Sequence, residues 1–146
     1  MAFPYKLILC PVAFDENSLR VLREAAAIAR AFGGKIVVLH VVWINPLSTE
    51  GFVFAELRDS QTKAALDKLT QFVAGELSGV DHQLAVEVGE AGDTILDLAK
   101  DLKPDLIVMA THGRHGVKHL MLGSVAERIV RSADAPVLTI HPHIPS

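Results

Sequence analysis

The chain is poor in the features that mark secreted and membrane-spanning proteins. One cysteine among 146 residues can form neither an internal disulfide nor a four-cysteine zinc site, and this usage is typical of a reducing compartment. The sequence has no run of about 18 apolar residues of the kind that spans a membrane. Its first residues open into a strand-like run, without the basic and apolar regions of a signal peptide. We therefore expect a cytoplasmic protein with no membrane partner.

An excess of charge of one sign is also missing. The formal net charge is -3, so the chain as a whole is not built to coat nucleic acid or anionic lipid, and we expect no nucleic-acid partner. Basic residues nevertheless concentrate between Ala110 and Arg131, where four lysines or arginines accompany a single glutamate. Either a solvated helix face or an anion-binding site explains this local excess.

Strand-like and helix-like segments alternate along the chain. Half of the residues are hydrophobic and 21% are charged, which is the composition of a globular protein, and the length fits one domain over 1–146. The alternation predicts an α/β fold with a parallel sheet and helices on both faces, hence three layers. The predicted strands are 6–12, 35–42, 84–88, 105–110 and 136–140. The predicted helices are 19–32, 65–77, 93–103 and 124–132, the first of them capped by Asn17 or Ser18 and the third by Asp93.

The segment after the fourth predicted strand favours phosphate binding. Ser124 and Glu127 form the Ser-x-x-Glu pattern of a capping box, which predicts that the last helix begins there. Gly123, directly before it, would let a ligand approach the backbone, and the first-turn N–H groups of a helix attract anions. Gly113 and Gly116 allow the same close approach in the preceding loop. In open parallel sheets, ligands bind beyond the carboxyl ends of the strands where the strand order reverses.

A purely structural explanation of these residues remains open. The three glycines can serve only to turn a tight connection, with Ser124 as a helix cap. The local positive excess favours phosphate, because glycines, exposed amides and basic side chains are what a phosphate chain needs. Better-known motifs are absent: the sequence has no GxxxxGK[ST], no GxGxxG after the first strand and no GxSxG.

From KLILCPV through LHVV and DLIVMATHGR to LGSVAERIVRSADAPVLTI, the sequence resembles the universal stress proteins. The most specific match is the spacing Gly-x2-Gly-x9-Gly-[Ser/Thr], typical of members that bind ATP. Gly113, Gly123 and Ser124 fit it, and Ala110 replaces its first glycine. The resemblance implies a three-layer sandwich with a five-stranded parallel sheet in the order 3-2-1-4-5, the Rossmann-like adenine nucleotide alpha hydrolase-like fold. It places the nucleotide between the ends of strands one and four.

The resemblance also implies nucleoside contacts, with one departure. ATP-binding members carry Pro-[Thr/Val]-Asp-Phe-Ser after the first strand, whereas this chain reads PVAFD from Pro11, with Ala13 at the aspartate position. Asp15 either substitutes for that aspartate or starts the first helix. An adenine contact falls on the backbone of Val41. The expected nucleotide contacts are Pro11, Val12, Ala13, Asp15, Val41, Met109, Ala110, His112, Gly113, Arg114, His115, Gly116, Gly123, Ser124 and Val125.

The function implied is a stress-response or regulatory protein that binds an adenine nucleotide such as ATP, with Mg²⁺ carried by the phosphates. No general base, nucleophile triad or arginine finger is evident, so we expect no catalytic residues and at most slow ATP hydrolysis. One alternative is a nucleotide-free, dimeric interaction module of the same family, which Ala13 and Ala110 favour. A second is an adenylating enzyme on a related fold, although its usual SGGxDS loop is missing after the first strand.

Three further expectations concern the sheet edge, the histidines and the cysteine. By resemblance the fifth strand lies at the edge, where it would pair with a second copy in a homodimer, unless the tail 141–146 covers it. His115 and His119 have a spacing that suits zinc, but no acidic third ligand accompanies them, and we expect no metal site in the protein. Cys10 is predicted to be a small buried residue without reactivity.

Overall fold

The computed structural model describes residues 3–45, 51–112 and 122–142. Within them, all strands join one parallel sheet in the order β3-β2-β1-β4-β5, as predicted. The strands are β1 (Leu7–Pro11), β2 (Lys35–Val42), β3 (Asp81–Val88), β4 (Leu106–Ala110) and β5 (Val137–Ile140). The helices are α1 (Glu16–Phe32), α2 (Gly51–Val73), α3 (Ala91–Leu102) and α4 (Ser124–Ser132).

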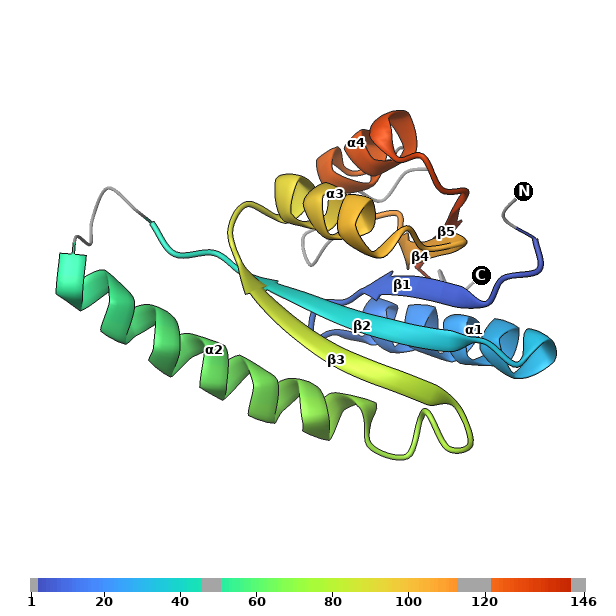
Figure 1. The fold of residues 1–146 in the computed structure, drawn as a ribbon, viewed down its shortest axis with the longest axis horizontal. Coiled ribbons are helices and arrows are strands. Elements are labelled where there is room, and N and C mark those ends of the chain that lie inside the picture. The colour runs from blue at the N-terminus through green and yellow to red at the C-terminus, as the bar shows by residue number, and fades with distance from the viewer. Residues whose placement is uncertain (1–2, 46–50, 113–121, 143–146) are drawn as a thin grey trace.

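The helices cover both faces of the sheet, so the predicted three-layer arrangement is confirmed. Figure 1 shows α1 and α2 on one side and α3 and α4 on the other. Successive residues of a strand point to opposite faces: Ile8 and Cys10 of β1 pack with α1 and α2, whereas Leu9 packs with α3 and α4. Burial on both faces explains why the strands read as continuous apolar runs.

Four elements begin earlier than the sequence indicated: α1 and α3 by three and two residues, and α2 and β3 as follows. The helix predicted from residue 65 begins at Gly51, because its first 14 residues bury no side chain and so lack the apolar periodicity that marks a helix. Phe52, for example, is 76% exposed. Strand β3 begins at Asp81 rather than at residue 84, since its first three residues are exposed and polar.

The predicted caps of two helices were wrong. Asp15 caps α1, with its Oδ1 accepting the Ser18 N–H at 2.8 Å, in place of Asn17 or Ser18. Glu90 caps α3 in place of Asp93, and its two carboxylate oxygens accept the N–H groups of Gly92 and Asp93. In both cases an acidic residue one position before the helix reaches the orphan donors of the first turn.

Strand β5 lies at one edge of the sheet, next to β4. Its side chains carry no charge, and Leu138 is 37% exposed. An unpaired, uncharged edge is a template for another strand.

None of the helices in the described ranges is both long and apolar enough to cross a membrane.

We expect two copies of the chain to pair through β5 in antiparallel fashion. Light scattering at micromolar concentration should then give twice the 15.8 kDa chain mass. Leu138→Lys should yield monomers, because a charge at an edge opposes strand pairing. Leu66→Lys is the matched control, since Leu66 is a 41% exposed leucine on α2, away from β5, and its replacement should leave the mass unchanged. A wild-type mass of one chain would contradict the dimer.

Cys10 lies in the middle of β1 with no exposed surface, which confirms its predicted burial. Burial raises the pKa of its thiol from 9.0 to about 12. At pH 7 the thiol is therefore protonated in both the folded and the unfolded chain.

This pKa difference predicts a loss of stability at alkaline pH. Between the two pKa values the unfolded chain binds fewer protons at Cys10 than the folded chain, so the free energy of unfolding falls as pH rises. From pH 9 to 11 the thiol should contribute a loss of about 2 to 3 kcal/mol. Urea unfolding of wild type and Cys10→Ala at several pH values measures it: the variant should show the shallower pH dependence, and equal slopes would refute the assignment.

Candidate functional site

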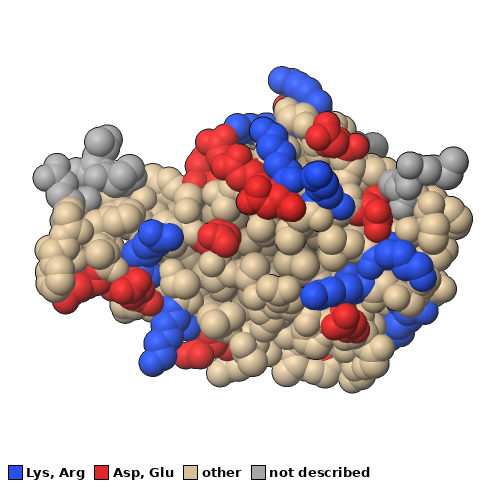
Figure 2. Space-filling view, in the orientation of Figure 1, with Lys and Arg blue, Asp and Glu red and all other residues tan. Residues whose placement is uncertain are grey.

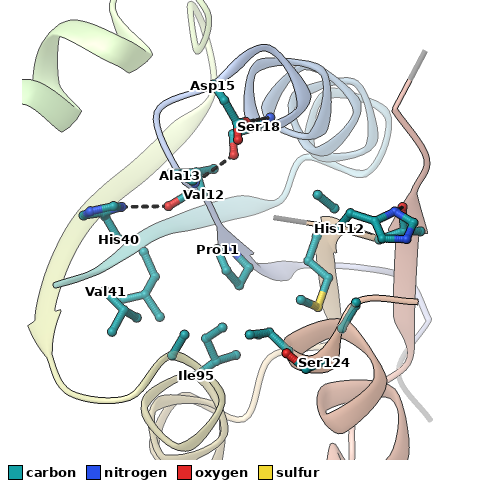
Figure 3. Close-up of a pocket in the computed structure, with 18 residues that line it drawn as sticks. Pro11, Val12, Ala13, Asp15, Ser18, His40, Val41, Ile95, His112 and Ser124 are labelled. Carbon is teal, nitrogen blue, oxygen red and sulfur yellow. Dashed lines mark hydrogen bonds between the residues drawn. The ribbon is translucent and has the colours of Figure 1, made fainter. Parts of the chain in front are cut away.

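A pocket of about 540 Å³ opens at the carboxyl ends of β1, β2 and β4. The chain runs from β1 to β2 on one side and later to β4 on the other, so the pocket lies where the strand order reverses (Figure 3). The predicted contacts that line it are Pro11, Val12, Ala13, Asp15, Val41, Met109, Ala110, His112, Gly123, Ser124 and Val125. The other four, Gly113, Arg114, His115 and Gly116, lie outside the described residues.

The pocket wall formed by the β1–α1 turn is held by hydrogen bonds within the protein. The Val12 N–H donates to the Leu39 carbonyl at 2.8 Å. His40 Nδ1 lies 2.9 Å from the Val12 carbonyl and therefore donates a proton to it, because a carbonyl can only accept. The Ala13 N–H donates to Ser18 Oγ at 2.7 Å. Both N–H groups and the Val12 carbonyl are thus already engaged.

On the β2 side, Val41 offers backbone groups to the pocket. The Leu39 carbonyl accepts the Val12 N–H that follows β1, and the Val42 carbonyl accepts the Gly89 N–H that follows β3. Because residues of a parallel strand direct their backbone groups to alternate neighbours, Val41 faces the β1 side. The register of β1 with β2 ends at the pair Pro11 and Leu39, so the N–H and C=O of Val41 face the space beyond β1.

Helix α4 begins at the pocket without a side-chain cap, so the predicted capping box was wrong. Gly123 is the N-cap residue, Ser124 is the first helical residue, and Glu127 pairs with Arg131 one turn later. The Ser-x-x-Glu pattern predicts Ser124 as the N-cap residue, but the N-cap is the preceding residue, Gly123. The Ser124 side chain is therefore one position past the cap. As a consequence, neither its exposed hydroxyl nor the first-turn N–H groups of α4 form a side-chain hydrogen bond with the described part of the chain.

His112 is buried beside this helix start. Its side chain is 5% exposed, Nδ1 lies 3.1 Å from Thr111 Oγ1, and the buried Nε2 has no partner among the described residues. Thr111 also connects two elements, since its N–H donates to the carbonyl of Ile140 in β5 and its carbonyl accepts the Gly123 N–H at 2.7 Å. A Cβ added to Gly123 would lie 3.2 Å from that carbonyl, so only glycine fits without displacement.

The remaining wall comes from α3 and α4, with Ile95 and Ser124 on the far side of the pocket from His40 in Figure 3. Arg128 of α4 forms ion pairs with Glu90 and Asp93 at the start of α3, and these pairs connect the exposed sides of the two helices. The backbone N–H groups of Asp93 and Gly92, followed by Arg128, lower the pKa of Glu90. Figure 2 shows acidic and basic side chains adjoining over this pair of helices.

Sequence reasoning missed part of the lining. Four of these residues, Leu39, Ala91, Ile95 and Ala126, are apolar, and their sequence signal is that of any core residue. Ser18, His40 and Thr111 are polar, but their roles depend on partners that only the fold brings near. Ser18 lies on the buried face of α1. A small polar residue at such a position is the only sequence signal that its hydroxyl has a hydrogen-bond partner in the fold.

Parallel-sheet topology and a pocket at the strand-order reversal define an α/β protein with a pocket where open parallel sheets bind their ligands. A family model of the universal stress protein family matches residues 4–141, and the chain belongs to that family. It is 33% identical to Universal stress protein MJ0531 of Methanocaldococcus jannaschii, over 93% of this chain and 82% of that protein. It is 32% identical to Universal stress protein A homolog 2 of Coxiella burnetii, over 93% and 94% of the two chains.

Solved structures agree with the fold. The structure of MJ0577, also from Methanocaldococcus jannaschii, superposes with a TM-score of 0.85 at 27% identity, covering 97% of this chain and 99% of that one. Two universal stress proteins of the same fold, both 23% identical to this chain, were solved with adenine nucleotides. One is in complex with cAMP, at a TM-score of 0.61, and one from Archaeoglobus fulgidus is in complex with dAMP, at a TM-score of 0.62.

A pair of serine substitutions tests the hydrogen bonds described for this site. Ser18→Ala should lower the free energy of unfolding by about 1 to 3 kcal/mol, because it leaves the half-buried Ala13 N–H without its acceptor. Ser124→Ala should change it by less than about 0.5 kcal/mol, since that hydroxyl caps nothing. Urea denaturation of both variants measures the difference. Equal losses would mean that Ser124 acts as a cap after all.

Proposed function

We propose that this protein binds an adenine nucleotide, with ATP as the leading candidate, in the pocket at the ends of β1, β2 and β4, and that it acts as a stress-response or regulatory protein. One observation carries the proposal: among the described residues, the pocket joins a backbone N–H and C=O of Val41 that have no strand partner to a helix start at Gly123 that has no side-chain cap. A nucleotide needs a hydrogen-bond donor and acceptor for its base and an anion-binding site for its phosphates.

The Val41 end suits the base. Adenine presents an N6 amine that donates and an N1 that accepts, and the C=O and N–H of one extended residue complement that pair. Guanine presents a carbonyl and an N1–H at the corresponding positions, which reverses the pattern. Apolar side chains of Pro11, Val41, Ile95 and Met109 line the same pocket and offer surfaces on which a flat base can pack.

The α4 end suits phosphate. The first-turn N–H groups of α4 lack a side-chain cap, and the helix dipole adds positive potential at this terminus. The Ser124 hydroxyl makes no hydrogen bond to the described residues and is available as a donor. We propose that Mg²⁺ accompanies the phosphates. The cAMP and dAMP complexes of proteins with this fold support an adenine nucleotide as the ligand class.

Calorimetry with ATP and Mg²⁺ tests the proposal. The wild type should bind ATP with a micromolar dissociation constant and bind GTP more weakly, because guanine reverses the donor and acceptor that face Val41. The absence of detectable heat or thermal shift at millimolar ATP would overturn the proposal. That result would favour an interaction module of the same family, which binds protein partners without a nucleotide.

Substitution at the helix start locates the phosphates. Gly123→Val should weaken ATP binding by about tenfold to a hundredfold, because its side chain would displace the Thr111 carbonyl and the α4 terminus that receives phosphate. Ser124→Ala should weaken it by about two- to tenfold, through loss of one hydroxyl donor. Circular dichroism checks that both variants keep the native helix content. Normal ATP binding by Gly123→Val would place the phosphates elsewhere.

A further inference from the structure

Strand β3 forms the second edge of the sheet and has no partner strand on its outer side among the described residues. With eight residues it is twice as long as β5. The Gly89 N–H donates to the Val42 carbonyl, so Gly89 faces β2 and Val88 faces away from it. Backbone groups of a parallel strand alternate in this way. The residues of β3 that direct their N–H and C=O groups to the open edge are His82, Leu84, Val86 and Val88. Such a row is a template for another strand.

A groove of about 380 Å³ lies between this edge and α2, which packs along β3 (Figure 1). Its described lining comes from one face of α2, between Arg58 and Leu66, and from the last three residues of β3. Leu66, Val86 and Val88 supply apolar surface, because the side chains of Val86 and Val88 point to the α2 side of the sheet. The groove shares no described lining residue with the pocket at Val41, so it is a separate site.

The groove opens toward the free edge rather than toward the centre of the sheet. Lys68 of α2 lies over the ring of Phe14, with its Nζ 4.6 Å from the ring centroid, and Phe14 follows the central strand β1. Leu66 precedes Lys68 by two residues, which places it about 200° away around the helix. Leu66 therefore points outward, and it is 41% exposed. A strand added to β3 would place every second side chain against Leu66.

Glu87 defines the charge that suits an added strand. Its side chain is exposed on the face of β3 opposite α2, because Val86 next to it points to the α2 side. It forms no ion pair within the described part of the chain, and its neighbour in β2 is the apolar Val41. Asp81, on the same face, already lies across from Lys35. A lysine or arginine opposite Glu87 would be favourable, whereas an acidic residue there would be repelled.

A second copy of this chain does not supply such a strand. The two sheet edges are β3, which reads DHQLAVEV, and β5, which reads VLTI. Neither contains a lysine or an arginine, and a second β3 would add acidic residues to an edge that already carries them. The complementary strand therefore belongs to a different protein.

We propose that the β3 edge and its groove bind an extended segment of a partner protein. The segment adds to the sheet as a sixth strand, with apolar side chains at the positions that face α2 and lysine or arginine at the alternate positions. Backbone hydrogen bonds to the edge supply affinity, and the groove at Leu66 together with Glu87 selects the side chains. The surface includes neither the pocket nor β5, so it requires neither a bound nucleotide nor pairing through β5.

A peptide of alternating valine and lysine, blocked at both ends and about nine residues long to span β3, tests the proposal on the wild-type chain. Fluorescence anisotropy of the labelled peptide should show saturable binding with a dissociation constant of about 10 to 100 μM. Two control peptides should each bind about tenfold or more weakly: one with glutamate in place of lysine, and the valine–lysine peptide with N-methylated peptide bonds. The absence of binding at millimolar valine–lysine peptide would overturn the proposal. Equal binding of the N-methylated form would also overturn it, because charge alone would then explain the attraction.

A charge reversal and a groove variant locate the peptide. Glu87→Lys should reverse the preference, so that the valine–glutamate peptide binds more tightly than the valine–lysine peptide. Leu66→Lys should weaken binding of the valine–lysine peptide about tenfold or more, because its longer, charged side chain fills the apolar part of the groove. The matched controls are Glu24→Lys on α1 and Val130→Lys on α4, which replace exposed residues away from β3. They should leave the dissociation constants unchanged to within about twofold.

Circular dichroism checks that the variants keep the native helix content. A folded Glu87→Lys chain that still prefers the valine–lysine peptide would overturn the assignment of Glu87 and the proposal with it. Light scattering that shows assemblies of more than two wild-type chains, broken by Leu66→Lys, would give this edge to a second copy and overturn the proposal of a different partner.

Discussion

The architecture of the site depends on where β1 leaves the sheet. Its register with β2 stops at the pair Pro11 and Leu39, and the chain then turns into α1, whereas β2 continues to Val42. The Val41 backbone is therefore left facing a gap instead of a strand. One early strand end thus produces both the concavity and the backbone polar groups of Val41 that face it.

The walls around this gap are fixed by interactions of different kinds. On one side, Asp15, Ser18 and His40 hold the β1–α1 turn through hydrogen bonds. On the other side, Arg128 connects α3 to α4 by ion pairs with exposed partners. Exposed pairs contribute little to stability, about 0 to 1 kcal/mol each. The turn is accordingly the more firmly held wall, and the helix pair owes its position mainly to the apolar cluster beneath it, around Ile95 and Ile129.

The sequence was informative wherever burial determines the pattern. The strands buried on both faces and the amphipathic α1 and α3 are read directly from apolar residues, and the family resemblance added the strand order. The start of α2 and the start of β3 were not predicted, because exposed residues carry no such pattern. The Ser-x-x-Glu pattern misplaced the cap of α4 by one residue, since Gly123 serves as N-cap by backbone conformation alone. The partners of Ser18 and His40 depend on turn geometry that no local pattern encodes.

Helix α2 combines an exposed first half with a second half that is packed on the core. Its buried residues, Ala65, Leu69 and Val73, all lie in the last nine positions, and the preceding 51–64 contribute none to the core. In Figure 1 the beginning of this first half projects beyond the carboxyl end of β3, at the left of the view. Opening it exposes little apolar surface, so it can unfold locally while the sheet and the pocket remain intact. We therefore expect amide hydrogens in this half to exchange with solvent through local opening, and those around Leu69 to exchange only through larger unfolding.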